Sequence, residues 1–189
     1  MNMILDIKTY PNKILTKKAK RVGEIDVAVK KLIDNMVETL CASKGAGLAA
    51  NQAGVLRQII IVDDSRDGGN VKVLINPRIV AKKGKVISVE GCLSLPGLEI
   101  EVKRPQKIEV EYYTLTKKDK TRLRSDGASA GPAFSDKIEN FEKKRIKASE
   151  LLARIICHEV DHLKGKTLLD KLPLLKRLKT KRQLRKAAK

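Results

Sequence analysis

The sequence predicts an α+β domain, with one helix near each end of the chain and short strands between them. A helical period of apolar residues in the N-terminal quarter, several β-branched runs in the middle and a second helical period near the C-terminus support this prediction. At 189 residues the chain has the length of a single domain. Because Trp is absent and aromatic residues make up only 3%, the core must consist mainly of Ile, Val and Leu.

The first helix is expected to begin after Asp26, whose carboxylate can cap it, and to end near Ala42. Its predicted buried stripe follows the helical period and comprises Val29, Ile33, Met36, Val37 and Leu40. The Gly-Ala-Gly run at residues 45–47 ends this helix and opens a loop that continues to Gly54.

Four runs with strand composition follow, at residues 58–62, 71–75, 85–89 and 107–115. The Asp-Gly-Gly-Asn sequence at residues 67–70 is expected to join the first two runs as a hairpin turn. Residues 117–149 are polar, basic and partly rich in Gly, Ser and Ala, so they are expected to form a solvated excursion from the fold.

The second helix is expected from Ser149 to Lys164, with Gly165 as its C-cap. Its apolar positions are Leu151, Leu152, Ile155, Ile156 and Leu163. In the last segment, leucines are scattered among cations. We therefore expect a main domain over residues 1–172 and a basic C-terminal helix or tail over residues 173–189.

The chain is strongly basic, with a formal net charge of +19. Residues 171–189 carry nine Lys or Arg residues and no acid, which indicates a partner of opposite sign. Three cysteines without a recognisable signal peptide do not suggest a disulfide framework, so free thiols in a reducing compartment are expected. No stretch is long enough to span a membrane, and we expect a cytoplasmic protein.

The only two histidines, His158 and His162, lie four residues apart in a segment that is expected to be helical. This spacing places both imidazoles on one face, where they can bind the same metal ion. Glu159 occupies the position of the general base in metal-dependent hydrolases. The alternative, two ordinary histidines on an amphipathic helix, is less favourable because burying two imidazoles without a partner is costly. The sequence therefore predicts a metal site.

A third ligand must be a thiolate or a carboxylate, since no third histidine exists. The extended metalloprotease motif H-E-x-x-H-x-x-G-x-x-H is excluded because Leu168 occupies its last position. The only acid after the second histidine is Asp170, close to the expected helix end. Cys157 should point about 100° away around the helix and serve as a small buried hydrophobe. Cys41 has no polar neighbour suited to a metal, whereas Cys92 follows a strand and a glycine, where a tight turn can aim its thiolate.

The Gly-rich segment at residues 45–52 reads Gly-Ala-Gly-Leu-Ala-Ala-Asn-Gln. It superficially matches a dinucleotide-binding fingerprint, but that motif follows a strand, whereas this segment follows a helix. A flexible loop that ends the helix is the simplest interpretation. A functional loop is the alternative, since its glycines permit close backbone approach to a substrate and Gln52 offers an amide donor to an oxyanion.

Together, residues 45–52, 90–94 and 158–162 resemble the three motifs of the peptide deformylases, G-x-G-x-A-A-x-Q, E-G-C-x-S and H-E-x-x-H, in that order and without a mismatch. The resemblance covers roughly residues 4–172. The chain departs from the family at Cys157, where Gln is frequent, in the length and charge of residues 117–149 and in its unusually cationic tail.

The resemblance implies a fold in which antiparallel sheets pack around a central metal-binding helix. It also implies an enzyme that hydrolyses the N-formyl group from the N-terminal formylmethionine of newly synthesised proteins and releases formate. Cys92, His158 and His162 would bind one divalent metal ion, with Fe²⁺ expected in cells and Zn²⁺, Ni²⁺ or Co²⁺ as alternatives. The other function classes are a metalloprotease and a degenerate relative that only binds the ribosome.

By the same resemblance, Glu159 would take a proton from the attacking water and pass it to the departing amine. Gln52 and the backbone N–H of Leu93 would stabilise the tetrahedral oxyanion. The methionine side chain or the peptide backbone of the substrate would contact Ala46, Gly47, Gly91 and Leu93.

Glu90 and Ser94 would support the turn that carries the thiolate, with Arg104 as the partner of Glu90. Local capping and surface pairing are the alternative roles of these residues.

Residues 173–189 allow two interpretations. A run of Lys and Arg is usually solvated or disordered, but leucines spaced through it favour an amphipathic helix with an apolar and a cationic side. Because deformylases act on nascent chains, we hypothesise that the tail docks on ribosomal RNA through salt-sensitive contacts. An anionic membrane surface is the alternative partner.

Overall fold

The computed structural model describes residues 3–65, 68–115 and 141–187. Antiparallel strands form a larger sheet, in the order β1 (Gly47–Ala49), β2 (Ile59–Val62), β3 (Lys72–Lys83), β6 (Lys107–Leu115) and β7 (Phe141–Ser149). A smaller sheet pairs β4 (Val86–Glu90) with β5 (Ile100–Arg104). The helices of these segments are α1 (Val27–Ser43), α3 (Glu150–Leu163), α4 (Leu174–Ala187) and the short 3₁₀ helices η1 (Lys13–Thr16) and η3 (Leu168–Lys171).

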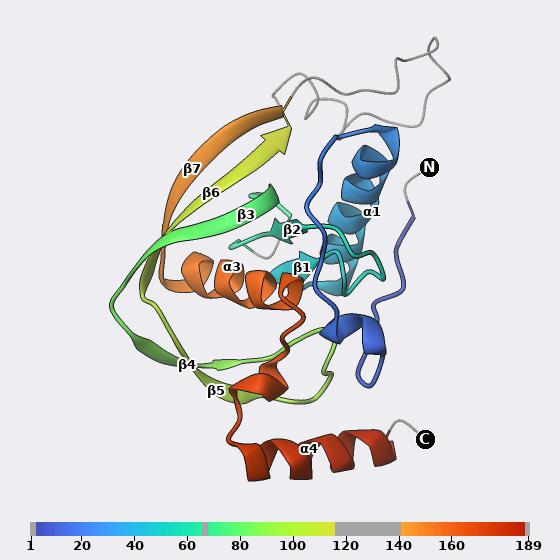
Figure 1. The fold of residues 1–189 in the computed structure, drawn as a ribbon, viewed down its shortest axis with the longest axis vertical. Coiled ribbons are helices and arrows are strands. Elements are labelled where there is room, and N and C mark those ends of the chain that lie inside the picture. The colour runs from blue at the N-terminus through green and yellow to red at the C-terminus, as the bar shows by residue number, and fades with distance from the viewer. Residues whose placement is uncertain (1–2, 66–67, 116–140, 188–189) are drawn as a thin grey trace.

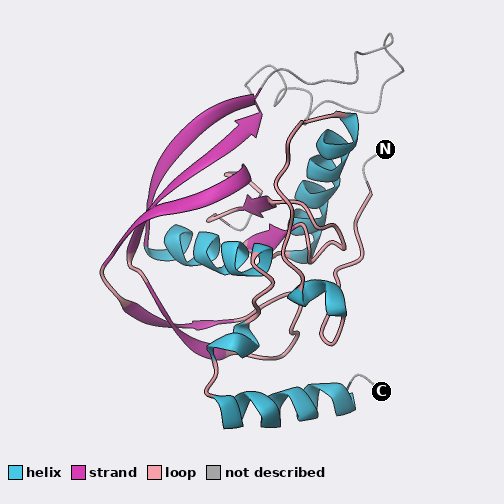
Figure 2. Ribbon diagram, in the orientation of Figure 1, coloured by secondary structure: helices cyan, strands magenta, loops and turns pink. Residues whose placement is uncertain are grey.

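α3 lies at the centre of the molecule, between the long curved strands of the larger sheet and the smaller sheet (Figure 1). α1 covers the opposite side of β1 and β2, so the larger sheet has a helix on each face there. Figure 2 shows that strands flank α3 on two sides. This arrangement confirms the predicted α+β fold with antiparallel sheets around one central helix.

β2 shows why one segment of the chain is apolar at every position. Its four residues are all fully buried. Ile60 and Val62 join the apolar cluster around α3, whereas Ile59 and Ile61 join the cluster around α1. Because successive side chains of a strand point to opposite faces, a strand with helices on both faces requires apolar residues throughout.

α1 confirms the first predicted helix. The Asp26 carboxylate accepts a hydrogen bond from the backbone N–H of Val29 at 2.7 Å. Lys44, with a φ of 52°, ends the helix in a left-handed conformation. The predicted stripe is buried at Val29, Ile33, Met36 and Leu40 and half-buried at Val37.

α3 also lies where the sequence predicts a helix. Ser149 has the extended backbone of an N-cap, and Gly165 follows the last turn with a φ of 70°. A Cβ atom at Gly165 would lie 2.5 Å from the carbonyl oxygen of Thr16 at the end of η1. Both the backbone conformation and this close approach therefore require glycine.

β7 corrects the prediction that residues 117–149 form a solvated excursion. The end of that stretch pairs with β6 along its whole length, and residues 116–140 lie outside the described part of the chain. Cations of β7 lie opposite glutamates of β6, as in the ion pair between Arg145 and Glu111. Cross-strand charge pairing therefore makes a polar, basic run into a strand.

Three further strands differ from the predicted pattern. β1 lies inside the expected loop from residue 45 to Gly54, β3 continues to Lys83 instead of ending at residue 75, and β5 falls where no strand is predicted. β1 and β5 are short, and each is a strand because a partner lies beside it. The predicted hairpin turn includes Asp67, which lies outside the described residues, although β2 and β3 are antiparallel neighbours.

α4 begins after Pro173 and lies at the edge of the molecule, beside the smaller sheet (Figure 1). Leu184 packs against the apolar cluster that the smaller sheet forms with η3. Arg177 pairs with Asp170 at 3.2 Å. The exposed leucines of α4 are Leu174, Leu175 and Leu178. None of the helices in the described ranges is both long and apolar enough to cross a membrane.

Candidate metal centre

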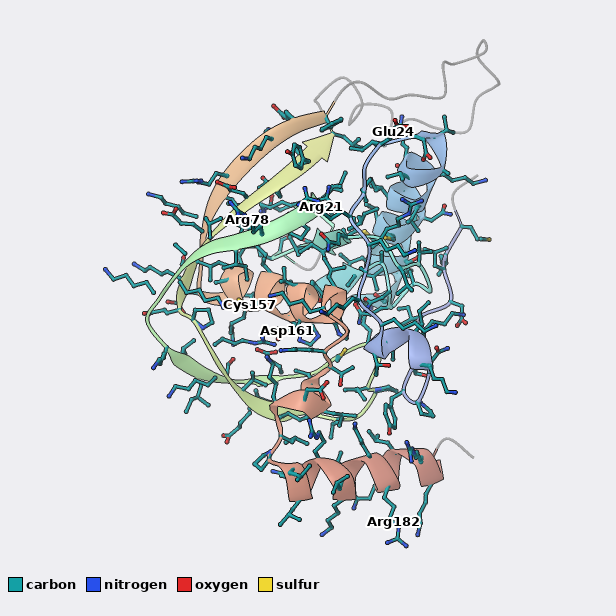
Figure 3. The ribbon with its side chains drawn as sticks, viewed as in Figure 1. Arg21, Glu24, Arg78, Cys157, Asp161 and Arg182 are labelled. Atoms are coloured by element: carbon teal, nitrogen blue, oxygen red, sulfur yellow. The ribbon has the colours of Figure 1, made fainter. Side chains whose placement is uncertain are left out.

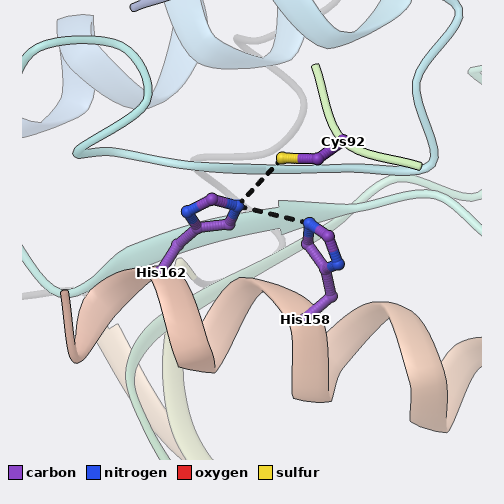
Figure 4. A group of neighbouring side chains, drawn as sticks. All are labelled: Cys92, His158 and His162. Carbon is purple, nitrogen blue, oxygen red and sulfur yellow. Dashed lines mark hydrogen bonds between the residues drawn. The ribbon is translucent and has the colours of Figure 1, made fainter. Parts of the chain in front are cut away.

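Two histidines of α3 and the thiol of Cys92 meet at one point (Figure 4). The Nε2 atoms of His158 and His162 are 3.2 Å apart, and the Cys92 Sγ atom is 3.2 Å from His162 Nε2. All three potential ligand atoms lie within 4.8 Å of one another. The structure thus brings together the three residues that the sequence suggests as metal ligands.

The spacing of these atoms fits a single metal ion. Metal–nitrogen bonds of about 2.0–2.1 Å and a metal–sulfur bond of about 2.3 Å place tetrahedral ligand atoms roughly 3.3–3.7 Å apart. The two measured separations of 3.2 Å are close to that range. A site with three protein ligands also leaves a position for water or substrate, which is typical of catalytic sites.

The electrostatics of the three ligands favour one positive charge at their centre. Burial and the neighbouring charge of His158 lower the pKa of His162 to about 3. Although burial opposes it, hydrogen bonding to Cys92 and Glu90 raises the pKa of His158 to about 10. Two imidazoles in such contact cannot both be protonated. A metal cation would supply positive charge in place of the proton on His158.

Glu90 orients His158 from the end of β4. Its Oε2 atom lies 3.1 Å from His158 Nδ1, which leaves Nε2 to face the other ligands. Arg104 donates from Nε and Nη2 to the two Glu90 oxygens, each at 2.8 Å. Although burial opposes it, hydrogen bonding to Arg104 and His158 holds the pKa of Glu90 down to about 2. The expected Glu90–Arg104 pair is thus present, and it is a buried pair because the Arg104 side chain is only 5% exposed.

Glu159 is buried against the backbone of β1. A Cβ atom at Gly47 would lie 2.6 Å from its Oε1 atom, so the carboxylate fits only because residue 47 is glycine. Burial raises the pKa of Glu159 to about 7. A carboxyl group with such a pKa can both accept and return a proton near neutral pH.

Gln52 directs its amide nitrogen into the same site. Its Oε1 atom accepts a hydrogen bond from the backbone N–H of Ala49 at 2.8 Å, which fixes the orientation of the amide. Its Nε2 atom donates to Ser94 Oγ at 3.3 Å and lies 3.6 Å from Cys92 Sγ. The buried Gln52 side chain is therefore a preorganised donor beside the candidate metal ligands.

A cavity of about 560 Å³ opens onto these groups. Its lining includes the residues predicted to contact substrate, namely Ala46, Gly47, Gly91 and Leu93. Among the apolar lining residues that sequence reasoning did not assign to the site are Leu151 and Ile155 of α3. They precede His158 by seven and three residues, so they lie on the same helix face as the histidines. The helical period could therefore have assigned them to the site.

Arg154, four residues before His158 on α3, shares this signal, whereas the charged lining residues Lys44 and Glu99 carry none in the sequence. The Gly-rich segment at residues 45–52 contributes Gly45, Ala46, Gly47 and Gln52 to the cavity lining. It is therefore part of the cavity wall and not only a loop that ends α1.

Comparison with known proteins gives consistent matches. The family model described as "Polypeptide deformylase" matches residues 4–131 and 134–178. A peptide deformylase of Thermodesulfovibrio yellowstonii is 40% identical over 176 residues, which are 92% of this chain and 92% of that protein. A peptide deformylase of Nitrosococcus oceani is 38% identical over 183 residues, covering 97% and 95%.

Solved structures agree with these sequence matches. A peptide deformylase from Legionella pneumophila matches with a TM-score of 0.79 and 32% identity, over 98% of this chain and 95% of that one. A peptide deformylase from Ehrlichia chaffeensis in complex with actinonin matches with a TM-score of 0.78 and 33% identity, over 98% of each chain.

Proposed function

This chain belongs to the peptide deformylase family, and from that membership we propose how its residues carry out the reaction. Its activity is peptide deformylation, the hydrolysis of an N-terminal formyl group. The observation that supports the proposed mechanism most directly is the convergence of Cys92, His158 and His162 on one point in the cavity that also contains Glu159 and Gln52.

We propose that Cys92, His158 and His162 hold one divalent ion. When bound, the ion supplies a Lewis acid that lowers the pKa of water and polarises a carbonyl oxygen. Two imidazoles and a thiolate suit several divalent metals. Fe²⁺ is the metal that we propose in cells, and Zn²⁺, Ni²⁺ and Co²⁺ can occupy the same donor set.

Glu159 is proposed as the general base and acid. It would take a proton from the water that attacks the formyl carbon and return that proton to the departing amine. The burial of Glu159, which raises its pKa to about 7, and its place on the cavity wall support this role.

Gln52 and the backbone N–H of Leu93 are proposed as donors to the tetrahedral oxyanion. The fixed amide of Gln52 supports its part, because donors that are already oriented cost no reorganisation during the reaction. Losing one such donor typically lowers kcat by about 10²- to 10³-fold.

The substrate proposed for this cavity is an N-formylmethionyl peptide of a newly synthesised protein. Leu93, Leu151 and Ile155 give the cavity an apolar wall that suits an unbranched methionine side chain. Ala46, Gly47 and Gly91 are proposed to contact the methionine or the peptide backbone, since small residues allow close approach. A cytoplasmic location, where nascent chains are available, is part of this proposal.

A deformylation assay on formyl-Met-Ala-Ser with defined metal tests this mechanism. Glu159→Gln should retain the metal but lower turnover by about 10²- to 10⁴-fold, because the proton acceptor is lost. Glu101→Gln, which changes an exposed carboxylate of β5 outside the cavity lining, is the matched control and should retain activity. Substantial turnover by Glu159→Gln would refute the assignment of the general base. Cleavage of the peptide bond instead of formate release would indicate a metalloprotease.

We also propose that residues 1–172 carry catalysis and that residues 173–189 dock on ribosomal RNA. Eight cations and no acid in residues 173–189 support the choice of an anionic partner. Arg182, on the outer side of α4, points away from the fold and is available to a partner (Figure 3).

The docking proposal is tested by replacing the exposed Lys176, Lys179 and Arg182 together with Gln, which keeps Leu184 and its packing. Co-sedimentation with ribosomes at low salt should fall, while deformylation of the free tripeptide persists. Replacing Lys82, Lys83 and Lys107 with Gln removes equal charge elsewhere and is the control. Unchanged co-sedimentation of the first variant would rule out docking through α4.

A further inference from the structure

Charged side chains connect the metal centre to the C-terminal segment through an unbroken series of contacts. Glu90 Oε2 lies 3.1 Å from His158 Nδ1. Arg104 binds Glu90 at 2.8 Å and reaches Asp161 Oδ2 with its third nitrogen, Nη1, at 2.6 Å. Lys171 Nζ lies 2.6 Å from the same Asp161 oxygen. The series therefore begins at a proposed metal ligand and ends at the last residue of η3.

With His158 as a neutral ligand of the proposed metal ion, the formal charges of the other side chains in this series cancel only when Lys171 is included. Glu90 and Asp161 carry two negative charges, and Arg104 alone supplies one positive charge. The side chains of Glu90, Asp161 and Arg104 are 9%, 18% and 5% exposed, so water screens them weakly. Without Lys171, two poorly solvated carboxylates would share a single guanidinium.

Such sharing would affect His158. Arg104 places Nε and Nη2 on Glu90 and only Nη1 on Asp161. If an unneutralised Asp161 drew the guanidinium toward itself, Glu90 would lose its two-point contact. Glu90 fixes the orientation of the His158 ring, and groups of this kind control how firmly a histidine holds its metal.

η3 holds Lys171 in a defined place. A reciprocal capping box begins this 3₁₀ turn, and Leu168 and Leu169 are buried beneath it. Asp170 pairs with Arg177 of α4, and the next residue, Lys171, pairs with Asp161 of the ion-pair series. These two consecutive residues therefore fix η3 to α4 on one side and to the series on the other. In Figure 3, Asp161 lies between α3 and the smaller sheet, where the series crosses from one to the other.

We propose that Lys171 is a positioning residue for the metal centre. Its charge neutralises Asp161, keeps Arg104 on Glu90 and thereby fixes His158. The proposal rests on the metal ligands proposed above. An ordinary surface ion pair contributes little because water and salt screen it and two long side chains lose conformational freedom. Lys171 differs because its acceptor also binds a buried guanidinium.

Co²⁺ titration of metal-free protein, followed by absorbance, tests the proposal. Lys171→Met keeps the length of the side chain and removes its charge, and it should weaken Co²⁺ affinity by about 10-fold, at the low end of the effect of groups that orient ligands. Lys171→Arg should restore the affinity. Lys72→Met is the matched control, because Lys72 pairs with Asp64 at 3.2 Å with similar exposure and lies outside the cavity lining and the ion-pair series. It should leave Co²⁺ affinity unchanged.

The outcomes separate the possible failures. Equal Co²⁺ affinity of Lys171→Met and Lys72→Met would overturn the proposal, as would weakened binding that Lys171→Arg does not rescue. If Lys171→Met does not fold, Lys171→Gln, which keeps a donor without the charge, is measured in its place and must also bind Co²⁺ more weakly than wild type. Failure of the wild-type protein to bind Co²⁺ would instead contradict the proposed metal ligands. In the deformylation assay, kcat should fall more than KM rises, because Lys171 is not among the cavity-lining residues.

Discussion

Gly47 shows how one missing Cβ atom makes room for Glu159, the proposed general base. The Glu159 carboxylate lies where a side chain at residue 47 would begin, with 2.6 Å between the two positions. We therefore expect Gly47→Ala to displace the carboxylate and lower kcat by about 10²-fold, since a shift of about 1 Å in a reacting group has such an effect. The measurement is steady-state deformylation together with metal content, which should not change.

The control for this substitution is Gly23→Ala, because a Cβ atom at Gly23 meets nothing within 4 Å. It should leave kcat unchanged. If Gly47→Ala retained wild-type kcat, the carboxylate would not need the position that the structure gives it.

Glu90 joins metal binding to stability through one carboxylate. Glu90→Gln removes the charge that pairs with buried Arg104 and weakens the hold on His158. We expect metal affinity to fall about 10- to 100-fold and the free energy of unfolding to fall by about 3–5 kcal/mol. Co²⁺ titration and urea unfolding measure the two effects. Glu101→Gln, at an exposed position of β5, should change neither quantity, and an equal loss in both variants would contradict the assignment.

Within α1, Asp34 is a charge in an unfavourable position. Its Oδ1 atom is buried and has no hydrogen-bond partner within the described ranges of the chain. Burial raises the pKa of Asp34, so the folded state binds its proton more tightly than the unfolded chain does. Stability should therefore fall as pH rises from the ordinary pKa of Asp through the folded value.

Asp34→Asn removes the partly buried negative charge and with it the loss of stability at neutral pH. We expect a higher urea midpoint than wild type at pH 7 and no gain at pH 3, where the wild-type carboxyl is largely protonated in both states. Asp26→Asn, which preserves the N-cap, should change little at either pH. A gain of equal size at pH 3 and pH 7 would mean that the effect does not come from the charge.

The helices could be predicted from the sequence because their signals are local. α1 has a capping carboxylate and an apolar period, and α3 ends at a glycine with positive φ. β7 had no such signal, since its cations resemble those of a solvated loop. Only the glutamates of β6, some thirty residues away in the chain, make it a strand, as the pairing of Arg145 with Glu111 illustrates.

The metal centre joins parts of the molecule that are distant in sequence. Cys92 lies between the two strands of the smaller sheet, whereas both histidines belong to α3, so a bound ion would connect the two layers. We expect metal to stabilise the fold by about 2.7 kcal/mol when its free concentration is 100 times Kd. Thermal unfolding with and without a chelator measures this effect. Cys92→Ser should unfold at nearly the same temperature in both conditions, and an equal chelator effect in this variant would contradict the proposed ligand.

The order and type of the main helices, the two histidines on one face and the candidate thiol all follow from the sequence, because helical periodicity and residue chemistry act over short distances. The tertiary structure alone decides that Asp161 and Lys171 extend the Glu90–Arg104 pair into one series behind His158. It also decides that Gly47 makes room for Glu159. The contact between Gly47 and Glu159 joins residues more than a hundred positions apart. The energies of all these contacts depend on burial, which exists only when the chain is folded.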